Sequence, residues 1–340
     1  MSRLRVAVIG AGNIAQQHLP VLTNHPDCEV AVLCDVNPEM LAESAQRFGI
    51  SEQEQSPDAL LRRDDLDAVY VLVSVLHVAR VASKFIAAGL PTFVEKPPGI
   101  CSADTERLAE LAEQHGTVAM VGVHRRFYST NIAVRERMAE LGPLATITVE
   151  AHQDQWGLYQ PDRLTKFNQL VRRRWAYANG IHALDMLRYF GGDVADIHAI
   201  RSSHEYDYPD SFSAVLRFTS GAQGRALVDW FAPAAYRCEL RTVGARATIA
   251  SSGHGFNTVT VSVRHQPDEH FELDADDQQY KAGFWKQAKA FLAGARSGEQ
   301  PPFPAASLAD AHRTMQMIDG ICQLSAEVEE DVELYLPMTA

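Results

Sequence analysis

Short apolar runs alternate with helical patterns through the first part of this 340-residue chain. Apolar runs without polar alternation are typical of buried parallel strands. We predict such strands at residues 6–9, 29–34, 68–73, 91–94 and 118–121. Helical periodicity predicts helices at residues 38–48, 79–88 and 102–115, the last with Ser102 as its N-cap and Gly116 as its stop. Strands separated by such helices predict a doubly wound parallel sheet.

The order of predicted elements changes after about residue 144, where strand patterns follow one another closely. We predict strands at residues 145–152, 197–203, 211–218, 222–230, 237–243, 247–251 and 258–263, and helices at residues 181–190, 279–295 and 307–327. Strands without intervening helices favour an antiparallel sheet. The sequence therefore predicts an α/β protein with two domains: residues 1–123 form the doubly wound sheet, and residues 124–340 form an α+β domain with a large, mostly antiparallel open-faced sheet.

A glycine turn follows the first strand and carries the first chemical signal. Gly10 allows the tight turn, Gly12 lets the backbone approach a pyrophosphate, and Ala15 takes the third small position, as in a dinucleotide-binding Rossmann domain. Asp35 directly follows the second strand, at the place where an acid binds the adenosine ribose and repels a 2′-phosphate. We therefore predict NAD as cofactor in preference to NADP. The predicted cofactor-binding residues are Gly10, Gly12, Asn13, Ile14, Asp35, Ser74, Glu95 and Lys96.

Composition and charge limit the possible partners. The formal net charge is −12, with 43 acidic residues against 31 Lys and Arg, which argues against a nucleic-acid or anionic-membrane partner. The five cysteines are scattered and form no C-x-x-C motif, so we expect reduced thiols and a cytoplasmic location. We expect no metal, because no H-E-x-x-H motif or tight histidine cluster occurs.

Glu95-Lys96-Pro97 follows the fourth predicted strand, and ligands of open parallel sheets bind beyond the carboxyl ends of the strands. With the glycine turn, Asp35, Gly122-Val123-His124-Arg125-Arg126-Phe127 and Gly180-Ile181-His182-Ala183-Leu184-Asp185, this tripeptide makes the chain resemble the glucose–fructose oxidoreductase / inositol dehydrogenase / MocA (Gfo/Idh/MocA) family. The resemblance spans both domains. It identifies a family and leaves the substrate open.

The resemblance implies a hydride transfer between NAD and a secondary hydroxyl or carbonyl of a sugar, cyclitol or sugar derivative. Lys96 matches the family lysine that bonds the reacting hydroxyl and moves its proton, and Pro97 matches a proline often preceded by a cis peptide. His182 matches a histidine that contacts the same hydroxyl. Asp185 matches an acid near the substrate, and we add Arg126, Tyr177 and Asn179 as substrate-binding residues. A homodimer or homotetramer through the C-terminal sheet is the family-level expectation.

Two positions depart from the family pattern. Ala178 stands where the family often has an Asp that completes a lysine–carboxylate–histidine group, and Val73-Ser74-Val75 replaces a frequent Thr-Pro. Ala178 cannot exchange a proton, so two alternatives remain open. One is an NAD-dependent glycosidase that uses transient oxidation and elimination, and the other is a non-catalytic NAD-binding sensor.

Overall fold

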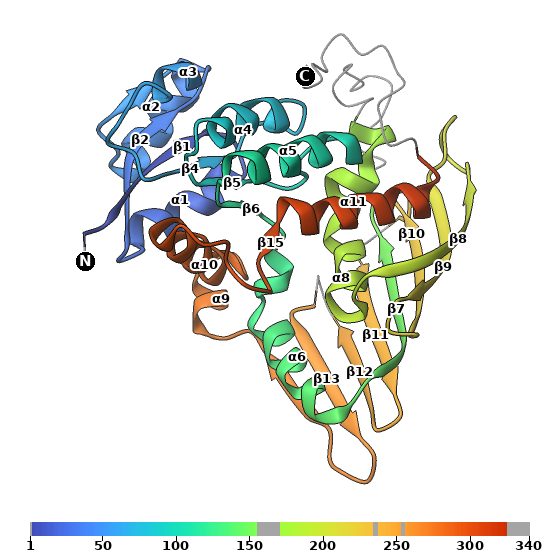
Figure 1. Ribbon diagram of the computed structural model, residues 1–340. Helices are drawn as coiled ribbons and strands as arrows, with labels where there is room; N and C mark the ends of the chain where they lie inside the picture. The colour runs from blue at the N-terminus through green and yellow to red at the C-terminus, as the bar shows by residue number, and fades with distance from the viewer. Residues whose placement is uncertain (1, 155–170, 234–236, 253–255, 325–340) are drawn as a thin grey trace. The chain divides into compact units, whose positions relative to one another are not determined.

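The computed structural model describes residues 2–154, 171–233, 237–252 and 256–324, which form two compact units (Figure 1). Within these ranges the first unit contains residues 2–124 and Asp276–His312, and the second contains Arg125–Ala275 and residues 313–324. The chain thus leaves the first unit one residue beyond the predicted boundary. It returns at Asp276, so a segment that the sequence analysis places in the second domain packs with the first unit.

The first unit is built on a seven-stranded sheet with the order β15-β6-β5-β4-β1-β2-β3, in which every pair is parallel except β15–β6. Its strands are β1 (Leu4–Ile9), β2 (Cys28–Cys34), β3 (Gln53–Glu54), β4 (Ala68–Val71), β5 (Thr92–Val94), β6 (Ala119–Val121) and β15 (Ala306–Ser307). Its helices are α1 (Ala15–Asn24), α2 (Pro38–Phe48), α3 (Pro57–Leu60), α4 (Val78–Ala87), α5 (Ser102–His115) and α10 (Phe284–Ser297), with α9 (Ala275–Gln279) at the re-entry. This confirms the predicted doubly wound fold.

Helix α10 belongs to the first unit because its aromatic residues pack on side chains of the sheet and of α1. Phe291 lies 5.1 Å from Tyr70 and 5.6 Å from Phe93 between ring centroids. The sequence predicts one helix over residues 279–295, whereas the structure has α9 and α10 with a loop between them. The buried carboxylate of Asp277 holds this loop by accepting a hydrogen bond of 2.8 Å from the backbone N–H of Gly283.

One predicted helix cap is wrong. Helix α5 begins at Ser102, so Ser102 is its first helical residue and Cys101 is the N-cap, with no side-chain capping bond. Gly116 ends the helix in the left-handed conformation as predicted, with φ of 62°. Strand β4 is also shorter than predicted and ends at Val71, which leaves Leu72 and Val73 in the loop beyond the sheet.

The second unit is built on an eight-stranded sheet with the order β14-β13-β12-β11-β7-β10-β9-β8, antiparallel except for the pair β7–β10. Its strands are β7 (Leu144–His152), β8 (Val194–Ser202), β9 (Ser211–Phe218), β10 (Gln223–Asp229), β11 (Arg237–Gly244), β12 (Ala247–Ser252), β13 (Thr258–Val263) and β14 (Glu269–Glu272). Strand β14 was not predicted, because its residues Glu-His-Phe-Glu offer one strongly apolar side chain. The predicted mostly antiparallel sheet is confirmed.

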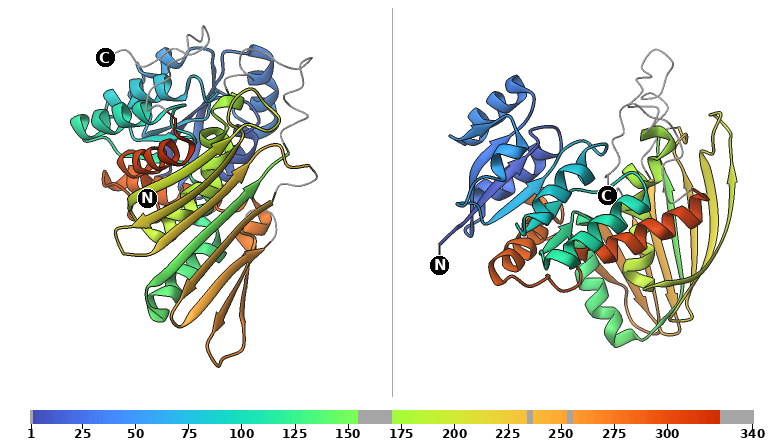
Figure 2. Two further views of the ribbon diagram at one scale, coloured as in Figure 1. Left: turned by 90° about the vertical axis from the view of Figure 1, so that its right-hand side faces the viewer. Right: turned by 45° about the horizontal axis from the view of Figure 1, so that its top comes forward.

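Helices α6 (Ser129–Leu141) and α8 (Ile181–Gly191) lie on one side of this sheet (Figure 2). The alternation along β9 shows the two faces: Phe212, Ala214 and Leu216 are buried, whereas Val215 and Arg217 are exposed. Helix α11 (Leu308–Cys322) begins in the first unit and continues into the second; the sequence predicts residues 307–327, of which those after Leu324 lie outside the described ranges.

Candidate active site

The glycine turn after β1 brings three strand ends together. Gly10 has φ of 106°, and a Cβ atom there would lie 2.5 Å from the carbonyl oxygen of Leu72, so only glycine fits. Its backbone N–H donates to the carbonyl of Cys34 at 2.7 Å. The turn therefore packs against the chain beyond β4 and is bonded to the end of β2.

A cavity of about 560 Å³ opens at these strand ends. Four of the predicted cofactor-binding residues line it: Gly10, Gly12, Asp35 and Ser74. Its other lining residues come from the same strand ends and from the helices beside them: Ile9, Cys34, Val36, Met40, Pro57, Asp58, Leu72, Val73, His77, Arg80, Val81 and Lys84. The structure thus gathers residues from five elements of one unit around a space of the size that small-molecule sites have.

The cavity fits the diphosphate and ribose of a dinucleotide. A Cβ atom on Gly12 would meet nothing within 4 Å, so the space above this glycine is open to a phosphate group. Asn13 and Ile14 follow in the turn that leads into α1, whose first turn carries no acidic residue. A helix N-terminus of this kind offers backbone N–H groups and a positive dipole end to an anion.

Asp35 is held rigidly at the cavity wall. Its Oδ2 accepts a hydrogen bond of 2.7 Å from the backbone N–H of Ala11, and its Oδ1 accepts one of 2.8 Å from the N–H of Asn37. Each carboxylate oxygen has a second lone pair, so the group can still accept hydrogen bonds from ribose hydroxyls. The backbone bonds thus orient the acid that the sequence predicts to bind the ribose.

Helix α4 contributes charged residues that the sequence analysis misses. Arg80 lines the cavity and is exposed, while Lys84 lines it one turn further on and pairs with Asp58 at 2.5 Å. His77 lines it as well, and burial, together with the nearby Arg80, lowers the pKa of its imidazole. The spacing 77, 80 and 84 indicates that these residues share one side of α4 and its N-cap, but it does not indicate that this side borders the cavity.

Glu95 and Lys96 lie directly after β5, the strand next to β4. Lys96 is half-buried, and the Lys96–Pro97 peptide is cis, as the resemblance implies. Glu95 is buried, and its Oε2 lies 3.1 Å from Nε2 of His18 on α1. The carboxylate of Glu95 is therefore engaged inside the unit, whereas the sequence analysis assigns this residue to the cofactor.

In the second unit, His182 stands in the first turn of α8. Every other residue of this helix is buried, and His182 is half-buried. The residues just before it, Ala176–Gly180, form a π-helical turn that contains Tyr177. Ala178 and Asn179 are half-buried in this turn.

Three residues predicted to bind substrate form hydrogen bonds to other side chains of the second unit. Tyr177 is buried and donates its hydroxyl to a carboxylate oxygen of Asp319, and burial raises the pKa of this phenol well above its usual value. Arg126 donates from Nε and Nη2 to the two oxygens of Asp185 at 2.7 and 2.6 Å, and both side chains are about 2% exposed. This engagement argues against direct substrate contact by the three side chains.

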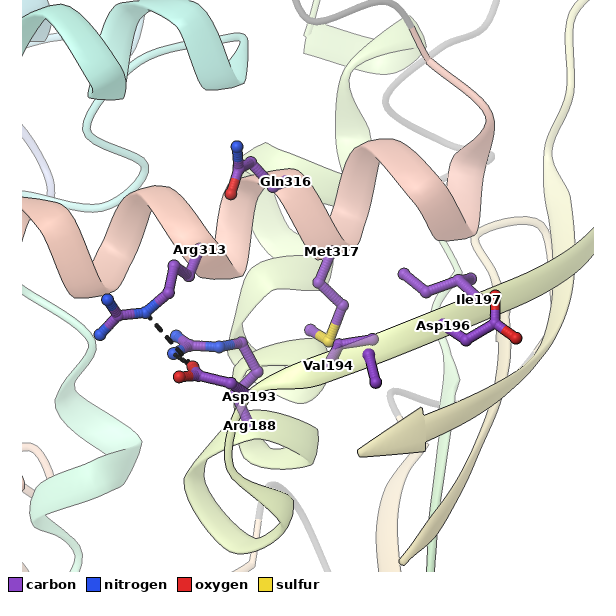
Figure 3. Close-up of a pocket in the computed structure, with 9 residues that line it drawn as sticks. Arg188, Asp193, Val194, Asp196, Ile197, Arg313, Gln316 and Met317 are labelled. Carbon is purple, nitrogen blue, oxygen red and sulfur yellow. Dashed lines mark hydrogen bonds and ion pairs between the residues drawn. The ribbon is translucent and has the colours of Figure 1, made fainter. Parts of the chain in front are cut away.

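The Arg126–Asp185 pair continues into a polar network on α8 and α11. Thr314 donates to Asp185 at 2.9 Å and receives a hydrogen bond of 2.9 Å from Arg188. Arg188 also pairs with Asp193 at 2.6 Å, beside a groove of about 400 Å³ between α11 and β8 (Figure 3). These bonds fix α8, the helix that carries His182, to α11.

Comparison with known proteins identifies the family. Residues 4–123 match the oxidoreductase family with an NAD-binding Rossmann fold, and residues 133–250 match the GFO/IDH/MocA C-terminal domain. The chain belongs to the Gfo/Idh/MocA family. This Gfo/Idh/MocA protein is therefore an oxidoreductase with an NAD-binding domain, as the sequence analysis predicts.

Several characterised proteins are similar over nearly their whole length. Myo-inositol 2-dehydrogenase of Thermotoga maritima is 24% identical over 307 residues, which cover 88% of this chain and 90% of that protein. Levoglucosan dehydrogenase in complex with NADH and L-sorbose superimposes with a TM-score of 0.80 at 18% identity, covering 95% of this chain and 96% of the other. KijD10, a 3-ketoreductase from Actinomadura kijaniata in complex with NADP and TDP-benzene, gives 0.74 at 23%, covering 94% and 97%. The two structures share the fold of this Gfo/Idh/MocA protein.

Within the described ranges, no three His, Cys, Asp or Glu side chains are grouped so that they could hold a metal ion. In the same ranges, each helix is too short or too polar to cross a bilayer.

Proposed function

We propose that this protein transfers a hydride between NAD and a secondary hydroxyl or carbonyl of a sugar, cyclitol or sugar derivative. The observation that carries the proposal is the cavity at the ends of β1, β2 and β4, with Gly12 open to a diphosphate and Asp35 fixed at its wall. Lys96 follows the neighbouring strand β5. The names of similar proteins, an inositol dehydrogenase and a levoglucosan dehydrogenase, support this class of substrate.

In this proposal the residues divide the work between binding and proton transfer. Gly10, Gly12 and the turn at Asn13 and Ile14 bind the diphosphate, and Asp35 binds the adenosine ribose; Ser74 lines the same cavity. NAD, when bound, supplies the hydride acceptor at its nicotinamide ring. During oxidation the substrate hydroxyl gives its proton to the amine of Lys96, with His182 as the second group that bonds this hydroxyl. In the reductive direction the protonated Lys96 donates the proton to the carbonyl oxygen.

The substrate side of the site is proposed for the second unit. His182 and Asn179 are half-buried polar residues within one helical turn of each other. Tyr177, Arg126 and Asp185 support this turn and helix α8 through their bonds to one another and to α11. Their part in substrate recognition is to hold His182 and Asn179 in place.

An absorbance screen at the NADH band tests the proposal. Purified protein with NAD or NADP is mixed with sugars, cyclitols and nucleotide sugars, and NADH is expected to accumulate in proportion to the substrate consumed. Cleavage of a glycoside without net NADH would replace the proposal by the glycosidase. NAD binding without turnover on any member of the panel would replace it by the sensor, which Ala178 favours because alanine cannot relay a proton.

Cofactor choice is expected to depend on Asp35 and Arg80. In Asp35→Ser the carboxylate that binds the ribose hydroxyls and repels a 2′-phosphate is gone, while Arg80 still lines the cavity. Loss of charge-assisted hydrogen bonds worth about 1.5–3 kcal/mol lowers kcat/KM for NAD about tenfold to a hundredfold. We expect kcat/KM for NADP to rise, measured with one substrate and both cofactors. In Asp35→Ser/Arg80→Ala the rise is expected to vanish; its persistence would show that Arg80 does not meet the phosphate.

We also propose a homodimer or homotetramer through the outer face of the second unit's sheet, in the cytoplasm. Apolar side chains on β8, β9, β10 and β11 support this interface: Ile200, Val215, Leu227 and Val243 are 72%, 53%, 42% and 39% exposed. Burial raises the pKa of the Cys28 and Cys34 thiols to about 12, which keeps them protonated and suits a reducing compartment. Sedimentation of the wild type and of Val215→Arg measures the assembly, and a monomeric wild type would contradict it.

A further inference from the structure

A buried acid–imidazole pair stands next to Lys96 and takes no part in the mechanism above. Glu95 is 5% exposed and His18 is 2% exposed, and Nε2 of His18 lies 3.1 Å from Oε2 of Glu95. Buried carboxylates are costly unless a donor bonds them, and the imidazole supplies that donor. The pair therefore ties the residue before Lys96 to helix α1.

The imidazole of His18 is enclosed by aromatic rings from three elements. Its ring centroid lies 6.0 Å from that of Tyr70 on β4, 5.3 Å from that of Phe93 on β5 and 4.4 Å from that of Phe284 on α10. Burial holds the pKa of the Tyr70 phenol well above its usual value, so this group stays neutral. The ring of His124 also packs on Phe284, 5.1 Å away between ring centroids. These aromatic rings hold the imidazole of His18 in one position.

The backbone around Glu95 is held on both sides. The N–H of Glu95 donates to the carbonyl of Val71 at 3.0 Å, and the N–H of Gly122 donates to the carbonyl of Val94 at 2.9 Å. A Cβ atom on Gly122 would lie 2.7 Å from Oε2 of Glu95, so the end of β6 also closes around this carboxylate. The residue before Lys96, Glu95, is therefore fixed through both its backbone and its side chain.

We infer that the His18–Glu95 pair positions Lys96, and that Glu95 acts through this bond rather than by binding the cofactor. The inference rests on the proposed function, because it assigns a support to the proposed proton-transferring amine. Displacing a reacting group by about 1 Å can lower a rate about a hundredfold. Loss of the His18–Glu95 hydrogen bond is therefore expected to lower kcat.

Variants of both members test the inference. His18→Phe fits the aromatic walls and removes the donor, whereas His18→Gln keeps an amide N–H that can reach the place of Nε2. Glu95→Leu removes the pair from the other side without leaving a buried charge. We expect kcat to fall about tenfold to a hundredfold in His18→Phe and Glu95→Leu, and no further in the double variant. NAD affinity is expected to stay within about threefold of the wild type, and His18→Gln to recover most of the rate.

A second readout is independent of turnover. Competitive labelling of amines with acetic anhydride, read by mass spectrometry, measures the reactivity of Lys96 against that of the exposed Lys289. We expect the Lys96 rate to change in His18→Phe and Glu95→Leu and to return in His18→Gln. Leu22→Ala, a buried truncation on the same helix, is the control that lowers stability without changing kcat per folded molecule.

The outcomes separate this inference from the proposed function. Wild-type kcat and Lys96 labelling in both His18→Phe and Glu95→Leu, with Lys96→Ala inactive, would overturn the positioning role alone. A loss of NAD affinity as large as the loss of kcat would show that Glu95 binds the cofactor. Should His18→Phe not fold, Glu95→Leu decides. Full turnover in Lys96→Ala would count against the proton-transfer role that the proposed function gives to Lys96.

Discussion

Lys96→Ala is expected to lower turnover about a hundredfold to ten-thousandfold, the range that a positioned acid–base group contributes. The affinity for NAD should change by less than about threefold, because the residues that line the cofactor cavity lie at other strand ends. Stopped-flow turnover and fluorescence titration with NAD measure the two quantities. The same loss is expected in both reaction directions, since one amine accepts the proton in oxidation and returns it in reduction.

The control is Lys289→Ala, which removes the same charge from an exposed position on α10. It should leave turnover and NAD affinity unchanged. Unchanged turnover in Lys96→Ala would remove the amine from the mechanism and leave His182 as the proton-transferring group. An equal loss of turnover and of NAD affinity would make Lys96 a cofactor-binding residue only.

That Gly10, Gly12 and Asp35 line one cavity was predictable because its signals are local. A strand, a glycine turn and a helix within 24 residues place Gly10 and Gly12, and the next strand delivers Asp35. Arg80 was not predictable in this way. It reaches the cavity because β4 lies beside β1 in the sheet, although β2 and β3 come between them in the sequence.

The partners of buried polar residues were beyond the sequence analysis for the same reason. Asp185 and Tyr177 carry polar groups in a segment that the family resemblance marks as functional, and the sequence analysis places both against substrate. Their partners on α11, Thr314 and Asp319, lie 129 and 142 residues away in the chain. Hydrophobic periodicity predicts that α11 is a helix. It does not indicate which polar side chains of α11 bond to Tyr177 and Asp185.

The segment 276–312 illustrates the same limit at the level of domains. Its helical pattern is plain in the sequence, but its unit is decided by contacts with distant side chains. Phe284 packs on His18 and Phe291 on Tyr70. Since aromatic rings bury large apolar areas, these contacts determine where α10 packs. The hydrophobic periodicity of the segment does not indicate them.

Asp185→Ala is expected to destabilise the second unit by about 3–5 kcal/mol, the range found when one partner of a buried ion pair is removed. The guanidinium of Arg126 would lose its two hydrogen bonds to the carboxylate of Asp185 in a place where it is 2% exposed. Thr314 would lose its acceptor as well. Urea unfolding followed by circular dichroism measures the change, with equal m-values showing that the comparison is valid.

Two further variants separate the buried charge from the loss of a contact. Glu269 on β14 makes a two-oxygen contact with Arg137 at the surface, so Glu269→Ala removes a similar bond where water can replace it. Its unfolding midpoint should stay close to that of the wild type. Arg126→Met/Asp185→Leu removes both buried charges and is expected to recover most of the stability, because apolar side chains of similar size can replace such a pair. If the double variant is as unstable as Asp185→Ala, the loss of stability comes from the missing hydrogen bond between Asp185 and Thr314 on α11, and not from the buried charge of Arg126.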